Sequence, residues 1–317
     1  MMEYRKLISF GKSSYVVSLP KKWVERNQLR KGDVIPVHDD HESLTLFAKT
    51  DKQEREPEQR IVISVDGKGI DELKRELIPA YINNYKMITL VGGEVREKTP
   101  QIKQLLHSLM ALEVMEQHAD HIIARDFLNL HEISIPMLIA KMDASTRSML
   151  VDTKRMFAED LYENIFSRDE DVNRLSYLSF RAIRYALRNP LIASQHYRLT
   201  SMELLNLWML TSQLEYIADE AKRIARVLKR ISLGRDEQEQ VIALLGKIER
   251  NYQDMMAACG KKDTMLAHQV SAKKPAIVAQ IKQLYEKNTE VRGIGALTEH
   301  LKIMTLAIHD IARSVYE

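Results

Sequence analysis

The sequence predicts a multidomain α+β protein with a small β-rich unit first, a small α/β domain next and a mostly α-helical bundle of two three-helix units last. A chain of 317 residues has room for two or three domains that each bury a core. Apolar residues alternate or form short runs in the first part, but recur with a helical period from about residue 133 onward. The 11 glycines and 8 prolines make up about 6% of the chain against an average near 12%, which predicts long helices with few turns.

These changes of pattern also predict where the domains begin and end. We expect a β-rich unit at 1–49, a linker at 50–59, a small α/β domain of unknown role at 60–132, a first three-helix unit at 133–232 and a second at 233–317.

The first 49 residues contain short apolar runs separated by turn signals, which predict short strands around one short helix. Pro20 suits the first turn of a helix over 21–27, because its missing N–H costs nothing there. The expected strands lie at 4–10, 15–19, 34–37 and 44–47. A unit of about fifty residues cannot easily bury enough surface alone, so we expect an obligate dimer.

The stretch from Thr50 to Glu58 is polar and charged, and is typical of a linker. The mixed pattern after it predicts a small α/β unit, although the pattern alone does not determine its topology. We expect strands at 60–65, 87–91, 111–115 and 121–127, and helices at 70–84 and 100–109.

The remainder of the chain predicts six long helices joined by short connections. They are expected at 137–166, 169–188, 199–232, 236–258, 264–287 and 296–315. The chain reversals are marked by Asn189-Pro190, Gly234, Gly260, Gly293 and Gly295. Six such helices form two antiparallel three-helix units that each bury one apolar stripe.

Positive charge is concentrated at the amino-terminal end. The whole chain carries 47 basic and 44 acidic residues, a net charge of +3 that by itself indicates no acidic partner. Residues 1–31 hold eight basic and two acidic residues, a net charge of +6. A dimer would double that charge, as expected for a surface that binds a phosphate backbone. The alternative is a solvated basic face without a partner.

Four short motifs in this unit resemble the AbrB/SpoVT family of swapped-hairpin DNA-binding domains. They are Arg5-Lys6-Leu7, Gly11-Lys12-Ser13-Ser14, the run from Val16 to Val24 that contains Leu-Pro-Lys-Lys, and Leu29-Arg30-Lys31-Gly32-Asp33. The resemblance implies a small β-barrel of interleaved hairpins from two chains, which binds double-stranded DNA and dimerises the protein. It implicates Arg5, Lys6, Lys12, Lys21 and Lys22 in DNA contact. The family fold also occurs in antitoxins and in proteins where it mainly dimerises.

Two helical segments resemble PhoU-type proteins, namely Arg168 to Leu178 and Gln213 to Ala221. Residues 301–312 resemble the same family more weakly. The likeness covers about residues 135–317. Together with an AbrB-like domain in front, it resembles archaeal PhoU-like regulators. The resemblance implies a role in phosphate uptake or homeostasis.

In the PhoU family, acidic residues four apart on facing helices can hold metal ions, so the resemblance implies a divalent metal or iron site. Glu215 and Asp219 keep that spacing, and the facing helix offers Asp169 followed by Asn173. Side chains four apart share a helix face, and carboxylates suit such cations. The alternative is that Asp169, Glu215 and Asp219 are solvated or pair with Arg181 and Arg184.

A second group of metal-type side chains lies in the α/β domain: Glu116, His118, Asp120, His121 and His131. These residues could supply nitrogen and oxygen ligands. The alternative is that the histidines are structural or exposed.

The sequence contains none of the usual catalytic signatures, such as a Walker phosphate loop, a GxSxG elbow or an HExxH motif, so we do not expect an enzyme. Cys259 is the only cysteine, which excludes an internal disulfide and fits a reducing compartment. No apolar stretch approaches the roughly 20 residues of a membrane span. We expect a cytoplasmic protein.

These observations predict a dimeric DNA-binding transcriptional regulator whose helical region dimerises or senses a signal. The expected partners are double-stranded DNA, further copies of the chain, and a phosphate-transport or signalling protein. One alternative is an adaptor that does not bind DNA and whose bundle docks on a transporter or kinase. The other is a metal-binding helical sensor.

Overall fold

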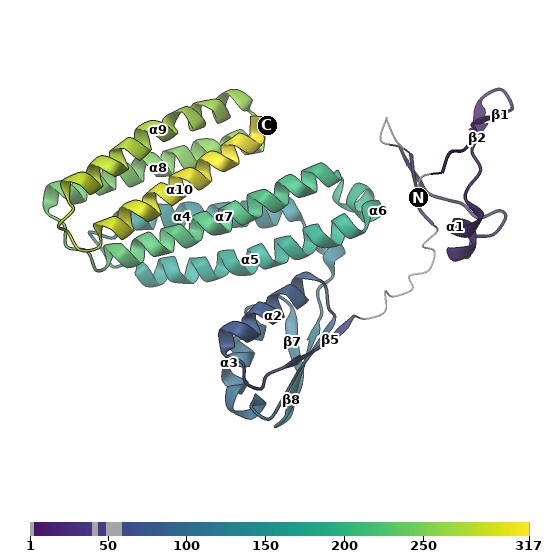
Figure 1. Cartoon of the computed structure of the whole chain (residues 1–317), viewed down its shortest axis with the longest axis horizontal. Helices are drawn as coiled ribbons and strands as arrows, with labels where there is room; N and C mark the ends of the chain where they lie inside the picture. Colours follow the sequence, from purple (N-terminus) through teal and green to yellow (C-terminus); the bar gives the residue numbers. More distant parts are fainter. Residues whose placement is uncertain (1–2, 40–43, 49–58, 317) are drawn as a thin grey trace. The chain divides into compact units, whose positions relative to one another are not determined.

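The computed structural model describes residues 3–39, 44–48 and 59–316, and the chain divides into two compact units, Met1–Glu58 and Gln59–Glu317. The first holds short strands and one short helix, and the second holds an α/β domain and a helical bundle (Figure 1). The predicted multidomain α+β class is confirmed.

The first unit contains two separate antiparallel hairpins and one short helix. Strands β1 (Ile8–Phe10) and β2 (Ser14–Val16) form one hairpin, helix α1 (Lys21–Arg26) follows, and β3 (Val37–Asp39) and β4 (Leu44–Leu46) form the other. The turn between β1 and β2 uses Gly11 at φ +72°, a value that glycine adopts without steric cost.

One expected strand in this unit is placed wrongly, because β3 begins at Val37 rather than at Val34. Pro36 precedes it and has no N–H to donate to a ladder. Its carbonyl instead accepts a hydrogen bond from the Phe47 amide at 3.0 Å, so the paired stretch starts one residue later.

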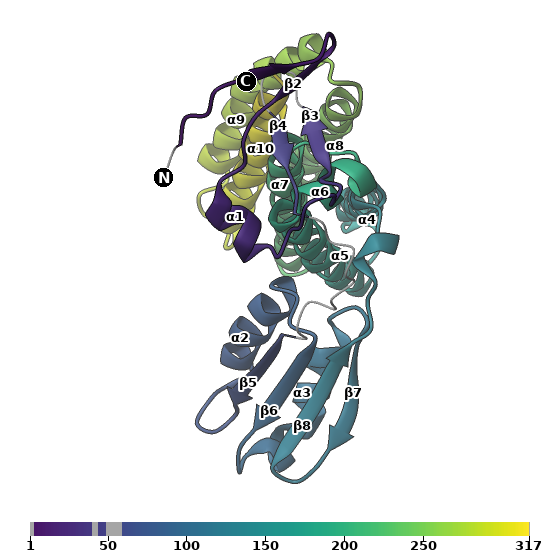
Figure 2. The same cartoon turned by 90° about the vertical axis from the view of Figure 1, so that its right-hand side faces the viewer.

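The α/β domain is a four-stranded sheet in the order β5-β6-β8-β7, with β5 and β6 parallel and the other pairs antiparallel (Figure 2). Its elements are β5 (Arg60–Ser64), α2 (Ile70–Ile82), β6 (Met87–Val91), α3 (Val95–His107), β7 (Leu112–Gln117) and β8 (His121–Asp126). Alternate strand residues such as Ile88, Leu90 and Ile122 are buried together with Leu73 of α2 and Ile102 of α3. The two helices therefore cover one face of the sheet.

Helix α3 begins at Val95, five residues before the predicted start at Pro100. The prediction treated Pro100 as a first-turn residue, but it lies inside the helix. A proline there removes only its own hydrogen bond to the carbonyl four residues earlier, and the apolar packing of Val95, Ile102 and Leu106 maintains the helix around it.

The bundle consists of two three-helix units, as predicted (Figure 1). The long helices are α4 (Ile135–Arg155), α5 (Tyr162–Arg188), α7 (Ser201–Leu228), α8 (Arg235–Lys261), α9 (Thr264–Lys287) and α10 (Ile294–Tyr316). A 3₁₀ turn (Leu130–Glu132) precedes α4, and α6 (Pro190–Ile192) and a π-helical turn (Ala193–Tyr197) connect α5 to α7. Helix α4 packs on α8 and α7 packs on α10, so one continuous hydrophobic core runs through both units.

The predicted helix over 137–166 is wrong at its end, because α4 stops at Arg155 and α5 starts at Tyr162. The intervening reversal contains neither glycine nor proline. Met156 and Leu161 within it are buried, so the apolar period continues across the break. Asp160 accepts a hydrogen bond from the Tyr162 amide at 3.2 Å and so satisfies one of the free donors at the start of α5.

A buried cluster around Arg181 joins the α/β domain to the bundle. The Arg181 side chain on α5 is fully buried and forms an ion pair with Asp126 of β8. It also donates to Asn84 at 2.6 Å, and its guanidinium lies 4.4 Å from the centroid of the Tyr81 ring. Arg181 therefore does not pair with the acidic residues of α5 and α7, which corrects the alternative suggested by the sequence.

None of the described helices is both long and apolar enough to cross a membrane.

Candidate nucleic-acid interface and acidic cluster

The five basic residues that the sequence assigned to DNA contact are all exposed. Arg5 and Lys6 precede β1, and Lys12 lies in the turn that joins β1 to β2. Lys21 and Lys22 are the first two residues of α1. Exposed basic side chains at strand ends, a turn and a helix start are available to phosphate groups.

Intramolecular ion pairs restrain two of these five side chains only weakly. Arg5 pairs with Glu3, and the Nζ atom of Lys21 lies 3.6 Å from a carboxylate oxygen of Glu25 one helical turn later. All four partners are solvated, and such surface pairs contribute about 0 to 1 kcal/mol. Other anionic groups can therefore displace them at little cost.

The short helix is held by its own backbone and by one side chain. The Pro20 carbonyl accepts hydrogen bonds from the amides of Trp23 and Val24, and the Asn27 side chain donates to the Trp23 carbonyl at 2.8 Å. Trp23 is half-buried, as are Val24 and Leu29. The indole is therefore only partly accessible to solvent.

The acidic residues of the bundle lie on α5 and α7, where a lysine bridges two of them. The Lys222 ammonium on α7 lies 2.5 Å from Oδ2 of Asp169 on α5 and 2.7 Å from Oδ1 of Asp219. Asn173 donates from Nδ2 to Oδ2 of Asp169 at 3.2 Å. The positive charge that a metal ion would bring to these two carboxylates is thus supplied by Lys222.

Burial changes the protonation equilibria of this cluster. It raises the pKa of Asp169 above its ordinary value, although the hydrogen bond from Lys222 opposes the change. It also raises the pKa of Glu215, with a further contribution from the negative charge of Asp219. Burial lowers the pKa of Lys222, but its hydrogen bonds to Asp169 and Asp219 outweigh that effect and leave the pKa above the ordinary value.

Comparisons with protein families agree with this helical arrangement. Residues 139–228, from α4 to the end of α7, match the family model described as the PhoU domain. The bundle contains a PhoU domain. Residues 8–55 match a second model, MazE_antitoxin, described as antidote-toxin recognition MazE, bacterial antitoxin. Comparisons with curated proteins and with solved structures each found no match.

The two matches confirm the predicted combination of an AbrB/MazE-type domain with a PhoU domain. The whole acidic cluster lies within the PhoU domain. In the amino-terminal unit, Lys12, Lys21 and Lys22 lie within the MazE match, whereas Arg5 and Lys6 precede it.

The metal site suggested at Asp169, Glu215 and Asp219 remains a prediction. In the part of the chain that the structure describes, these three residues do not form a set of ligand atoms close enough to hold one ion; the set that does is Glu116, His118 and His121. A metal ion at the acidic cluster would first have to displace the Lys222 ammonium.

Sequence reasoning did not find the pairing of Glu220, whose side chain is fully buried on α7. Glu220 accepts from Arg223 at 2.6 Å and lies 2.8 Å from Nδ1 of His300 on α10. The contact joins the PhoU domain to the second three-helix unit. Asp219 and Glu220 are adjacent in the sequence, but only the packed structure shows that one faces α5 and the other faces α10.

Proposed function

We propose that the protein is a dimeric DNA-binding regulator of transcription. In this proposal, the MazE/AbrB-type domains of two chains bind duplex DNA, while the helical region dimerises or responds to a signal linked to phosphate. The MazE/AbrB-type domain supports regulation by DNA binding or by antitoxin-type binding, and the PhoU domain supports regulation linked to phosphate. The proposal assigns no catalytic step to the chain.

The observation that carries the proposal is the exposure of apolar side chains in the amino-terminal unit. Among residues 3–48, none of the side chains that the structure describes is buried, and each is either exposed or partly exposed. Phe10, Tyr15 and Leu44, one on each of three strands, are 69%, 70% and 68% exposed. A unit of this size, with large apolar side chains this exposed and none buried among its described residues, is expected to cover them against a partner. A second copy of the same unit supplies the missing core if the two pairs of hairpins interleave into one barrel.

Charge supports DNA as the ligand of that dimer. The net charge of +6 in residues 1–31 becomes +12 when two copies combine. Cations that neutralise DNA phosphates release counterions, so affinity falls steeply as salt rises. Exposed Lys12, Lys21 and Lys22 are suited to such contacts.

The test is binding of the full-length protein to genomic DNA fragments, including its own promoter, across a salt series. We expect selective binding near physiological salt. Lys21→Ala with Lys22→Ala should weaken it and make the salt slope shallower. The matched control is Lys282→Ala with Lys287→Ala, two exposed lysines on α9. Weak binding that is equal on all fragments, or equal losses in both double variants, would contradict the proposal.

A second candidate function is that of an adaptor that does not bind DNA, which fits a matching family described by toxin recognition rather than by DNA binding. In this case the unit dimerises the chain and the bundle docks on a transporter, a kinase or another signalling protein. This candidate predicts little DNA affinity at physiological salt, so the same salt series separates the two.

A further inference from the structure

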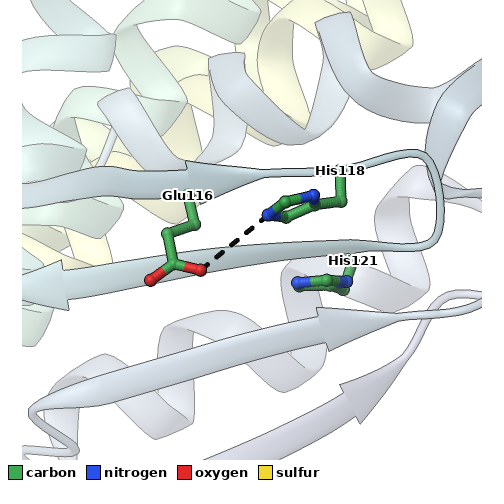
Figure 3. A group of neighbouring side chains, drawn as sticks. All are labelled: Glu116, His118 and His121. Carbon is green, nitrogen blue, oxygen red and sulfur yellow. Dashed lines mark ion pairs between the residues drawn. The ribbon is translucent and has the colours of Figure 1, made fainter.

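A compact group of two imidazoles and one carboxylate lies at one end of the sheet in the α/β domain (Figure 3). Glu116 is near the end of β7, His118 directly follows the last residue of that strand, and His121 begins β8 across a two-residue turn. Their ligand atoms all lie within 4.8 Å of one another. The rings of His118 and His121 stack with centroids 4.4 Å apart and planes 20° apart.

A β-bulge brings these side chains to one face of the sheet. Val114 pairs with Ala124, but the next pair is Glu116 with Ile123, so Met115 is an extra residue in β7. Without it, strict alternation would turn Glu116 and His118 toward the helix-covered core. Bulges re-aim side chains in this way and are frequent beside functional sites.

Asp120 orients one of the two imidazoles. Its Oδ1 atom lies 2.8 Å from Nδ1 of His121, so the carboxylate accepts the Nδ1 proton. A proton fixed on Nδ1 leaves Nε2 of His121 with a free lone pair, which is the arrangement that metal-bound histidines usually show.

We propose that Glu116, His118 and His121 form a binding site for a divalent transition-metal ion of the zinc type. Two nitrogen donors and one carboxylate suit such ions better than Mg²⁺ or Ca²⁺, which prefer oxygen. Zinc bound at about 2.1 Å in tetrahedral geometry places its ligand atoms about 3.4 Å apart. The Glu116 Oε2 and His118 Nε2 atoms are 3.9 Å apart, and both side chains are more than half exposed, so small rotations complete the geometry.

The site is distinct from both regions described above. It lies outside the residues that match the MazE and PhoU models. His131, which the sequence grouped with it, instead packs against His196, with ring centroids 5.3 Å apart, and against Tyr185. In tetrahedral geometry the three protein ligands leave the fourth coordination position open to water or to a donor group from another molecule.

The test is calorimetric titration of the untagged full-length protein with Zn²⁺ after removal of bound metal by a chelator. We expect a binding event of one ion per chain that His118→Asn with His121→Asn abolishes. Glu116→Gln should weaken it, and Asp120→Asn should weaken it about 10- to 100-fold, since it removes the group that orients a ligand. Co²⁺ should give a visible absorption band that is lost in the same variants, and excess Mg²⁺ should not compete.

Two controls make the test decisive. His107→Asn removes an exposed histidine at the end of α3 and should leave Zn²⁺ binding unchanged. Glu215→Gln with Asp219→Asn should also leave it unchanged, which separates this site from the acidic cluster. The variants at the proposed site and at His107 should keep the melting temperature, because surface substitutions rarely change stability by more than about 0.5 kcal/mol. Failure of wild-type protein to bind Zn²⁺, or undiminished binding by the double histidine variant, would overturn the proposal.

Discussion

Lys222 gives the acidic cluster of the PhoU domain a positive charge of its own. Glu215 and Asp219 drew attention because carboxylates four residues apart share a helix face. Lys222 follows Asp219 by three residues and lies on that face as well, yet only packing against α5 shows that its ammonium reaches Asp169. The sequence therefore identified acidic residues that cluster, but not the cation that bridges two of them.

Replacement of this lysine tests both the ion pairs and the metal prediction. Lys222→Met keeps much of the aliphatic stem but leaves Asp169, whose side chain is 3% exposed, without its charged partner. We expect a loss of about 3 kcal/mol in the free energy of unfolding, because an uncompensated buried charge is costly. Urea denaturation measures it, and Lys282→Met on the solvated side of α9 is the matched control.

Added Mn²⁺ gives the same experiment a second result. If Asp169, Glu215 and Asp219 can hold a metal ion, Mn²⁺ should restore stability to Lys222→Met by occupying the vacated position. No gain in stability with Mn²⁺ would count against a metal site at these residues.

Cys259 should be an unreactive thiol in the folded protein. Burial, with a smaller contribution from Asp143, raises its pKa from 9.0 to about 11. At pH 8 the folded state then holds about 100-fold less thiolate than the unfolded state, and the thiolate is the reactive form. Alkylation by iodoacetamide should be correspondingly slower in native than in urea-unfolded protein. Equal rates would contradict the burial.

The same shift has a consequence for stability. Well below pH 9 the thiol is almost entirely neutral in both states, so it contributes little pH dependence there. As the pH rises from 9 to 11, the unfolded chain loses this proton before the folded chain does. The contribution of Cys259 to stability therefore falls across that range.

At the scale of elements, the ends of helices and strands could be predicted where residues that favour turns interrupt the regular spacing of apolar residues. Asn189-Pro190 and Gly234 mark real helix ends. The reversal between α4 and α5 was missed because Met156 and Leu161 are core residues inside the loop. The bulge at Met115 was also missed, because one extra residue in a six-residue strand gives no separate signal in the sequence.

The buried ion pair between Arg181 of α5 and Asp126 of β8 provides a prediction at the scale of elements. Arg181→Met should lower the free energy of unfolding by about 3 kcal/mol, because it leaves the fully buried Asp126 with Lys86 as its remaining ionic partner. It should also speed hydrogen exchange in β8 and the facing turn of α5. Arg188→Met removes an exposed hydrogen bond to Asn83 between the same two domains and should change stability by less than about 0.5 kcal/mol. Similar effects of the two substitutions would contradict the role assigned to Arg181.

At the scale of the whole molecule, the sequence predicts that the amino-terminal unit needs a partner, because fifty residues bury too little surface. The structure adds that the apolar side chains of its strands are exposed in the single chain. Which surfaces meet in an assembly depends on the second copy and does not follow from one sequence.

Phe10→Asp tests the assembly in the full-length protein. A carboxylate buried at a barrel interface is costly, so we expect weaker dimers in sedimentation experiments and a matching loss of DNA affinity. Val62→Asp, which introduces the same charge at a 66% exposed side chain of β5 in the α/β domain, should change neither. Unchanged sedimentation and DNA binding by Phe10→Asp would exclude this face as the interface.

The continuous core of the bundle bears on how such a chain can be rearranged in evolution. The PhoU match ends at residue 228, but Ile217 and Ile224 of α7 share a core with Leu301 and Met304 of α10. A gene segment that encoded the matched residues alone would produce a domain whose apolar surface on α7, normally covered by α10, is exposed to solvent in any new host protein. The segment that recombination can transplant is therefore longer than the segment that sequence comparison recognises, and it includes the second three-helix unit.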